Sequence, residues 1–170
     1  SPRNVRFFDW DNDKRIDWLR TFSGGGTTEV LANTKTGFVS MAVDNIGLAF
    51  DESPLQLADV NGDGLQDPVA LVVTGAVIDV QYKLNLGFGR WSPAWRTVTV
   101  SGFTAAQAAV AELEDLDGDG LCDLVAVTTN DVALALGRGG TSFSPVITID
   151  TAALGSGSIP TRGTGTTISY

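Results

Sequence analysis

Hydrophobic and polar positions alternate in short runs along the chain, and glycine, asparagine and aspartate interrupt these runs at close intervals. The runs are rich in valine, isoleucine, threonine and aromatic residues and are seldom longer than seven residues, as is typical of β-strands. Helical periodicity is scarce. Its best example is the alanine-rich segment 104–112, which we interpret as an irregular linker holding one helical turn. The pattern predicts an all-β fold.

The order of runs repeats three times along the chain. Each copy contains an acidic loop, and the first aspartates of these loops, Asp9, Asp59 and Asp115, lie 50 and 56 residues apart. Every loop is followed by an apolar run, a turn and a second run. A short segment that contains glycine and ends in an aromatic residue comes next, and a third run closes the unit. With the short run before its loop, each unit holds about four strands. Four strands in roughly 40–50 residues predict a blade of a β-propeller.

The repeats also give a predicted domain organisation for the single propeller segment 1–170. We place the three blade-like units at residues 3–53, 54–109 and 110–164, and interpret 165–170 as the start of a fourth unit or a tail. Propellers close with about four to eight blades, so three units do not complete a ring. We therefore expect a fragment of a longer chain. Its expected partners are other blades or domains of the same parent protein, or a second copy of the chain.

Composition narrows the classes of function. The 170 residues are 43% hydrophobic, enough for a core, and carry a net charge of −9, which opposes binding to nucleic acid and suits a cation. The chain has no histidine and one cysteine, Cys122, so Ser-His and Cys-His pairs and zinc sites built on imidazole or several thiolates are excluded. The longest apolar stretch, around 68–78, is about half of a membrane span. We expect neither an enzyme nor a membrane span.

The acidic loops carry the candidate chemistry. Their spacing, D-x-[DN]-x-D-x-x-x-D, places side-chain oxygens at loop positions 1, 3, 5 and 9, and calcium loops commonly add a backbone carbonyl at position 7. The predicted ligands are Asp9, Asp11, Asp13, Arg15 and Asp17 in the first loop, Asp59, Asn61, Asp63, Leu65 and Asp67 in the second, and Asp115, Asp117, Asp119, Leu121 and Asp123 in the third. Arg15, Leu65 and Leu121 would contribute the carbonyls. The cofactor predicted from this set is Ca²⁺, with up to three ions.

Two other interpretations of the loops fit less well. Aspartate and glycine are common in solvated turns, but three copies at matched spacing argue against that explanation. An EF-hand needs a glutamate at position 12, where this chain has Arg20, Ala70 and Ala126. Charge favours the metal, because eleven of the twenty acidic residues lie in these loops and would repel one another without a cation. Three calcium ions would change the net charge from −9 to −3.

The three loops are predicted to differ in affinity. Glycine at position 6, Gly64 and Gly120, allows the tight reversal around the ion, whereas the first loop has Lys14 there. Lys14 and Arg15 also place positive charge near the first site, and the second loop has the neutral Asn61. The third loop, with four aspartates and two glycines, is expected to bind most tightly.

The three units resemble FG-GAP or VCBS-type repeats, the calcium-loop blades of integrin α-subunit propellers and of many secreted bacterial proteins. The phrases VRFFDWDNDKRIDWL, LADVNGDGLQDPV and LALGRGGTSFSPV are similar, more narrowly, to the propeller repeats of RHS-type and Tc-toxin B-type proteins. The resemblance implies a calcium loop between the first two strands of each blade. It also implies a secreted, extracellular or cell-surface protein whose propeller belongs to a toxin shell, with the toxic activity elsewhere in the chain.

The function expected from these observations is a calcium-binding structural or interaction module. The alternative is a carbohydrate-binding, lectin-type propeller, in which Trp91 and Trp95, with Tyr82 nearby, would form a platform for sugar stacking. A protein or glycan ligand is thus an additional expected partner. Cys122, at loop position 8, is interpreted as a small buried side chain.

Overall fold

The computed structural model describes residues 5–11, 13–22, 27–49 and 55–150. Three antiparallel sheets, each of four strands in sequence order, make up this part of the chain. They are β1 (Val5–Phe8), β2 (Asp17–Thr21), β3 (Thr28–Asn33) and β4 (Phe38–Met41); β5 (Leu55–Ala58), β6 (Asp67–Thr74), β7 (Val77–Tyr82) and β8 (Arg96–Val100); and β9 (Ala111–Glu114), β10 (Asp123–Val127), β11 (Asp131–Ala135) and β12 (Ile147–Asp150). The predicted all-β class is confirmed. The predicted unit boundaries stay a prediction, and residues 165–170 lie outside the described residues.

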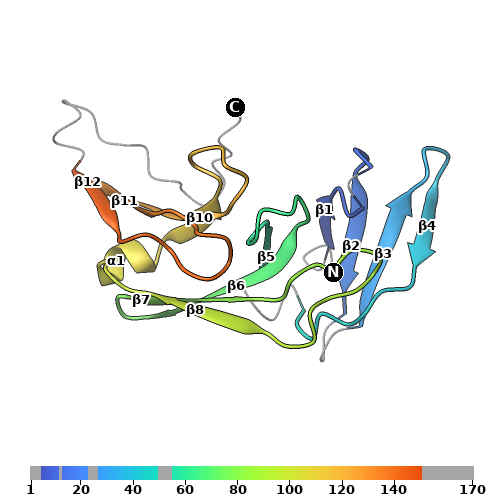
Figure 1. Cartoon of the computed structure of the whole chain (residues 1–170), viewed down its shortest axis with the longest axis horizontal. Coiled ribbons are helices and arrows are strands. Elements are labelled where there is room, and N and C mark those ends of the chain that lie inside the picture. Colours follow the sequence, from blue (N-terminus) through green and yellow to red (C-terminus); the bar gives the residue numbers. More distant parts are fainter. Residues whose placement is uncertain (1–4, 12, 23–26, 50–54, 151–170) are drawn as a thin grey trace.

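The three sheets are arranged as a fan of propeller-type blades (Figure 1). The first strands lie toward the inside of the fan, and β4, β8 and β12 lie at its outer ends. Two contacts join the inner strands of successive blades: the Arg6 side chain donates to the Leu55 carbonyl at 3.5 Å, and β5 contacts β9. The blades therefore pack face to face around a common centre, as the blades of a propeller do.

Each sheet is short and alternates in burial, so it is stable only when its faces are covered. Strand β2 shows the pattern clearly, with Leu19 buried and its neighbours Trp18 and Arg20 exposed. One apolar cluster joins the first two blades and includes Leu19 and Trp91, and a second cluster joins the second and third blades. The hydrophobic core thus lies between the blades, and burial there supplies most of the stabilisation.

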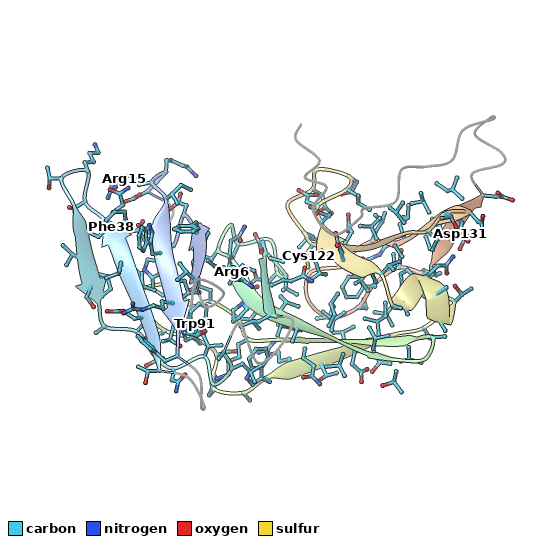
Figure 2. The ribbon with its side chains drawn as sticks, turned by 180° about the vertical axis from the view of Figure 1, so that it is seen from behind. Arg6, Arg15, Phe38, Trp91, Cys122 and Asp131 are labelled. Carbon is cyan, nitrogen blue, oxygen red and sulfur yellow. The ribbon has the colours of Figure 1, made fainter. Side chains whose placement is uncertain are left out.

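Trp91 corrects one expectation from the sequence. It is only 4% exposed and lies at the junction of the first two blades (Figure 2). Its ring packs edge-on against Trp10 at 5.6 Å, and its indole N–H donates to the Asp44 carbonyl at 3.0 Å. Tyr82 is also buried, with its hydroxyl bonded to the Gly140 carbonyl of the third blade. The predicted sugar platform of Trp91, Trp95 and Tyr82 is therefore wrong, because two of its three rings are part of the packing between blades.

The single described helix, α1 (Ala105–Ala108), is the one helical turn expected between the second and third units. A capping box starts it: the Gln107 N–H donates to the Thr104 hydroxyl, and the Gln107 side chain accepts from the Thr104 N–H. The same glutamine donates to Asp131 at 3.0 Å, which ties the linker to the third blade. Among the described residues, no helix has the length and apolar character needed to cross a membrane.

The packing between blades generates a stability prediction. Replacing Trp91 by alanine should lower the free energy of unfolding by about 3–5 kcal/mol, because it empties a buried aromatic site. The matched control is Phe88→Ala, since Phe88 is an aromatic of the same segment that is 96% exposed, and this change should cost less than about 0.5 kcal/mol. Urea unfolding of the two variants measures the difference. Equal losses would contradict the inter-blade role of Trp91.

Candidate metal-binding loops

The three acidic loops join the first two strands of each blade and fold in the same way. At loop position 1, the aspartate carboxylate accepts a hydrogen bond from the backbone N–H of position 6 in every copy. The three bonds are Lys14 to Asp9 at 2.8 Å, Gly64 to Asp59 at 2.7 Å and Gly120 to Asp115 at 3.1 Å. This bond closes the loop into a ring around its own first carboxylate.

The side chains at positions 3 and 5 repeat a second pattern. In every loop the N–H of position 5 donates to the side-chain oxygen of position 3, at 3.2–3.3 Å, and the N–H of position 7 donates to the carboxylate of position 5, at 2.8–2.9 Å. The side-chain oxygens at positions 3 and 5 are thus held by backbone donors of their own loop. Hard cations are bound by several oxygens of this kind.

Position 6 has a left-handed backbone conformation in all three loops. The φ angles are +82° at Gly64, +87° at Gly120 and +69° at Lys14. Glycine adopts this conformation without cost, whereas a residue with a Cβ is strained. Lys14, which lacks the freedom of glycine, is therefore strained, and the first loop makes the same backbone turn at this position as the other two.

The aspartate at position 9 has a structural role that the sequence analysis did not identify. Asp17, Asp67 and Asp123 are almost completely buried. One oxygen of each accepts the N–H of loop position 2, at 2.9–3.1 Å, and the other accepts an N–H just at or beyond the end of the third strand, at 2.6–2.7 Å. This aspartate therefore fixes the loop to β3, β7 or β11.

The residues that donate this second bond are Asn33, Asn85 and Gly137, which the sequence analysis also missed. Both asparagine side chains donate in addition to the carbonyl of loop position 8, in Ile16 and Gln66. In the third blade there is no room for a side chain, because a Cβ on Gly137 would collide with the carbonyl of Cys122. The signal available in the sequence was the matched place of these residues, at the end of the second run after each loop.

The structure brings some of the predicted ligands together and leaves others apart. Carboxylate oxygens of positions 1, 3 and 9 lie within 4.8 Å of one another in the first loop (Asp9, Asp11, Asp17) and in the third (Asp115, Asp117, Asp123). Two oxygens bound to one calcium ion at about 2.3–2.6 Å are at most about 5 Å apart. Each of the two clusters is therefore compact enough to hold one metal ion. Neither cluster includes the position 5 aspartate, Asp13 or Asp119.

The side-chain contacts of positions 3, 5 and 7 differ among the three loops. In the first loop the Arg15 guanidinium forms an ion pair with Asp13, which engages one predicted ligand. In the second loop the Asn61 amide donates to Asp63 at 2.9 Å, so a neutral side chain occupies position 3. The third loop has neither contact, and its glycines at positions 4 and 6 have positive φ, as those of the second loop do. The ranking in which the third loop binds best stays a prediction.

Two titratable groups near the loops have shifted pKa values. Burial raises the pKa of Asp67 from 3.8 to about 7; Asn85 and Val60, through their N–H donors, oppose the shift, and the carboxylates of Asp63 and Asp59 add to it. Burial also raises the pKa of the Cys122 thiol to about 12, with a smaller contribution from the charge of Asp123. The thiol therefore stays protonated at neutral pH and is unreactive, as expected for a small buried side chain.

The raised pKa of Asp67 gives a pH dependence for protein freed of divalent ions. Between about pH 4 and 7 the folded state retains the proton that the unfolded state loses, so this group contributes stability below about pH 4 that is lost as the pH rises through 7. The difference in unfolding free energy between the wild type and Asp67→Asn should therefore shrink across that interval. Urea titrations at a series of pH values in EDTA measure it. A difference that grows with pH would contradict the shift.

Comparisons with known proteins found solved structures with a similar fold but no matching family. No protein-family model matches the chain, and no curated protein matches it. Among solved structures, a Tc holotoxin pore of Photorhabdus luminescens aligns over 86% of this chain and 7% of its own, with a TM-score of 0.60 and 25% identity. A lectin of Agrocybe aegerita, studied for its recognition of non-reducing terminal N-acetylglucosamine, aligns over 84% of this chain and 37% of its own, with a TM-score of 0.58 and 23% identity. This chain is thus similar to a small part of a toxin assembly and to about a third of a lectin.

Proposed function

We propose that this chain is a calcium-binding β-propeller module with a structural or interaction role in a larger secreted, toxin-shell type of protein. The observation that carries the proposal is the threefold recurrence of one hydrogen-bond pattern around the oxygens of loop positions 1, 3, 5 and 9. A pattern required only for a turn would not need three or four carboxylates in each copy. The role is proposed as non-enzymatic.

The chemistry of the donors favours calcium over other ions. All side-chain donors are oxygens, which suit a hard cation, and the chain contains no histidine. Calcium accepts six to eight oxygens in flexible geometry and so suits a loop of carboxylates and carbonyls, whereas magnesium demands near-ideal octahedral geometry and usually keeps several waters. Asp9, Asp11 and Asp17 would hold an ion in the first loop, and Asp115, Asp117 and Asp123 in the third.

The position of the loops suggests what a bound ion does. The backbone N–H of Cys122 in the third loop donates to the carbonyl of Asp59 in the second, at 2.9 Å. Leu121 also lies over Gly62, where an added Cβ would be 3.1 Å from its side chain. The second and third loops therefore lie against each other at the seam between two blades. An ion that rigidifies a loop would also hold the neighbouring blade in place.

The toxin-shell part of the proposal is supported by the similarity to the Tc holotoxin structure, of which this chain spans 7%. We propose that a part of this size contributes structure and contacts to the larger protein, with any toxic activity encoded elsewhere in it. The proposed location is secreted or cell-surface, where calcium is present at about the millimolar level that sites of this kind require.

A carbohydrate-binding function is the second candidate, and two observations favour it. One is the similarity to the lectin. The other is a groove of about 510 Å³ between the second and third blades, lined by residues 97–101, at the C-terminal end of β8, and by residues 141–145, with six Ser and Thr hydroxyl groups. Calorimetric titration with glycans ending in N-acetylglucosamine separates the two functions, since a purely structural module binds none.

Calcium removal is the direct test of the main proposal. At a dissociation constant of about 0.1 mM and about 1 mM calcium, each site stabilises the fold by about 1.4 kcal/mol, so the sites of the first and third loops together contribute about 3 kcal/mol. EDTA should therefore lower the melting temperature by roughly 10 °C. Magnesium added at the same concentration is the control and should restore little. An identical melting curve with and without calcium, on protein shown by elemental analysis to be metal-free, contradicts the proposal.

The loops should also differ from one another. Asp119→Ala in the third loop should cost more calcium-dependent stability than Asp13→Ala in the first, because Arg15 already neutralises Asp13 and Lys14 is strained. The matched control, Lys14→Gly, should strengthen the first site. Calorimetry of each variant at one calcium concentration gives the comparison. Equal losses from the two alanine variants would remove the ranking.

A further inference from the structure

The face of the first blade that points away from the second blade carries an exposed aromatic surface. Phe7 of β1 and Trp18 of β2 lie opposite each other in register, with ring centroids 5.4 Å apart, and Phe38 of β4 lies 5.2 Å from Trp18. Figure 2 labels Phe38 on this blade. Phe7 is 60% exposed and Trp18 is 39% exposed, although aromatic rings of this size are usually largely buried. We call Phe7, Trp18 and Phe38 the aromatic face.

The same register positions are covered in the other two blades. Trp18 corresponds to Pro68 and Leu124, counted from the first aspartate of each loop, and both of these are buried. Leu124 belongs to the cluster between the second and third blades. These positions are therefore the ones that receive the preceding blade. The aromatic face has the geometry of such a contact but receives no blade among the described residues.

The far face of the third blade is the complementary surface. Val125, Leu134 and Ile147 lie side by side across β10, β11 and β12, and Val125 is opposite Glu112 of β9. Their neighbours Leu124 and Ala133 face the second blade and are fully buried. We call Val125, Leu134 and Ile147 the aliphatic face.

Loop position 2 supports the pairing of these two faces. In the first two loops it holds Trp10 and Val60, each 3% exposed, which pack in the clusters shared with the following blade. In the third loop it holds Leu116, which is 45% exposed. Position 8 behaves in the opposite sense: Cys122 is buried against the preceding loop, and Ile16 is 55% exposed. At positions 2 and 8, side chains that are buried between blades within the chain are therefore exposed where the equivalent position lies on an outer face.

Charge distinguishes the outer faces from the internal seams. At the seam between the second and third blades, positions 7 and 8 of one loop, Leu121 and Cys122, lie against the preceding loop. The first loop presents Lys14, Arg15 and Ile16 at positions 6 to 8, where the third loop has Gly120, Leu121 and Cys122. A blade placed against the first would set these basic side chains beside its own loop. The third blade offers there Glu114 and Asp119, which are exposed and lie outside the cluster of Asp115, Asp117 and Asp123.

We propose that the aliphatic face of one copy of this chain docks on the aromatic face of a second copy, so that two copies form one closed ring of six blades. The contact continues the packing already seen between the blades of one chain. It adds opposite charge at the loops, which favours this pairing over the association of two aromatic or two aliphatic faces. Two identical head-to-tail contacts related by a twofold axis close the ring. Six blades lie within the range that propellers adopt.

The experiment uses the 170-residue chain with calcium present. Sedimentation equilibrium should give a dimer at about 100 µM, and raised salt should weaken it, because the loops are exposed and their attraction is screened. Trp18→Glu puts an acidic group on the aromatic face and Leu134→Arg puts a basic group on the aliphatic face. Each variant alone should associate at least tenfold more weakly. An equimolar mixture of the two should recover the dimer, because it retains one unaltered contact and places Glu against Arg in the other.

Matched controls test for general effects of charge. Phe88→Glu and Leu86→Arg make the same changes at exposed positions of the second blade, away from both faces, and should leave association unchanged. Circular dichroism and melting of each variant establish that it is folded. A wild-type monomer at 100 µM overturns the proposal and leaves the faces to blades outside these 170 residues or to another partner. A dimer that is lost in Trp18→Glu but kept in Leu134→Arg also overturns the proposal, because it would pair two aromatic faces. An open polymer in place of a dimer overturns it as well.

Discussion

The fold depends on three buried carboxylates, those of Asp17, Asp67 and Asp123. Each accepts two backbone N–H groups, one from its own loop and one from the end of the third strand of its blade. Burial of a carboxylate is costly unless donors replace the lost water, and here both oxygens are matched. These two bonds fix the loop, the first hairpin and the third strand relative to one another. The positions of all other loop oxygens follow from that frame.

The same carboxylates link stability to the proposed metal. Asp17 and Asp123 belong to oxygen clusters of ion size, so the group that holds the frame also faces the candidate site. Burial raises the pKa of Asp67 to about 7 although its two backbone N–H donors oppose the shift, and the neighbouring carboxylates of Asp63 and Asp59 add to it. A divalent cation favours the ionised form and so reverses this effect. The proposed metal would therefore offset the mutual repulsion of the eleven acidic residues, out of twenty, that lie in the loops.

The all-β class, the three repeats and the loop geometry could be predicted because they are local properties of the sequence. The strain at Lys14, for example, followed from its alignment with two glycines. The environment of Trp91 could not be predicted, since its burial depends on Trp10 of another blade and on the carbonyl of Asp44. The second hydrogen-bond donor to each position 9 aspartate could not be predicted for a similar reason. Its donor lies 14 to 18 residues away in sequence, and its place depends on strand register.

Repeated blades face a specificity problem, because identical faces would pair in any order. The chain addresses it with side chains that differ at equivalent positions. Where the second and third blades receive a neighbour, Ala70 and Ala126 allow close approach, and the first blade has Arg20 at that position, 2.5 Å from Glu29. A face carrying an ion pair and aromatic rings cannot receive the same surface that packs on alanine. The size and charge of a few residues therefore determine which surface each blade face can receive, while the buried aspartates keep the frame of each blade the same.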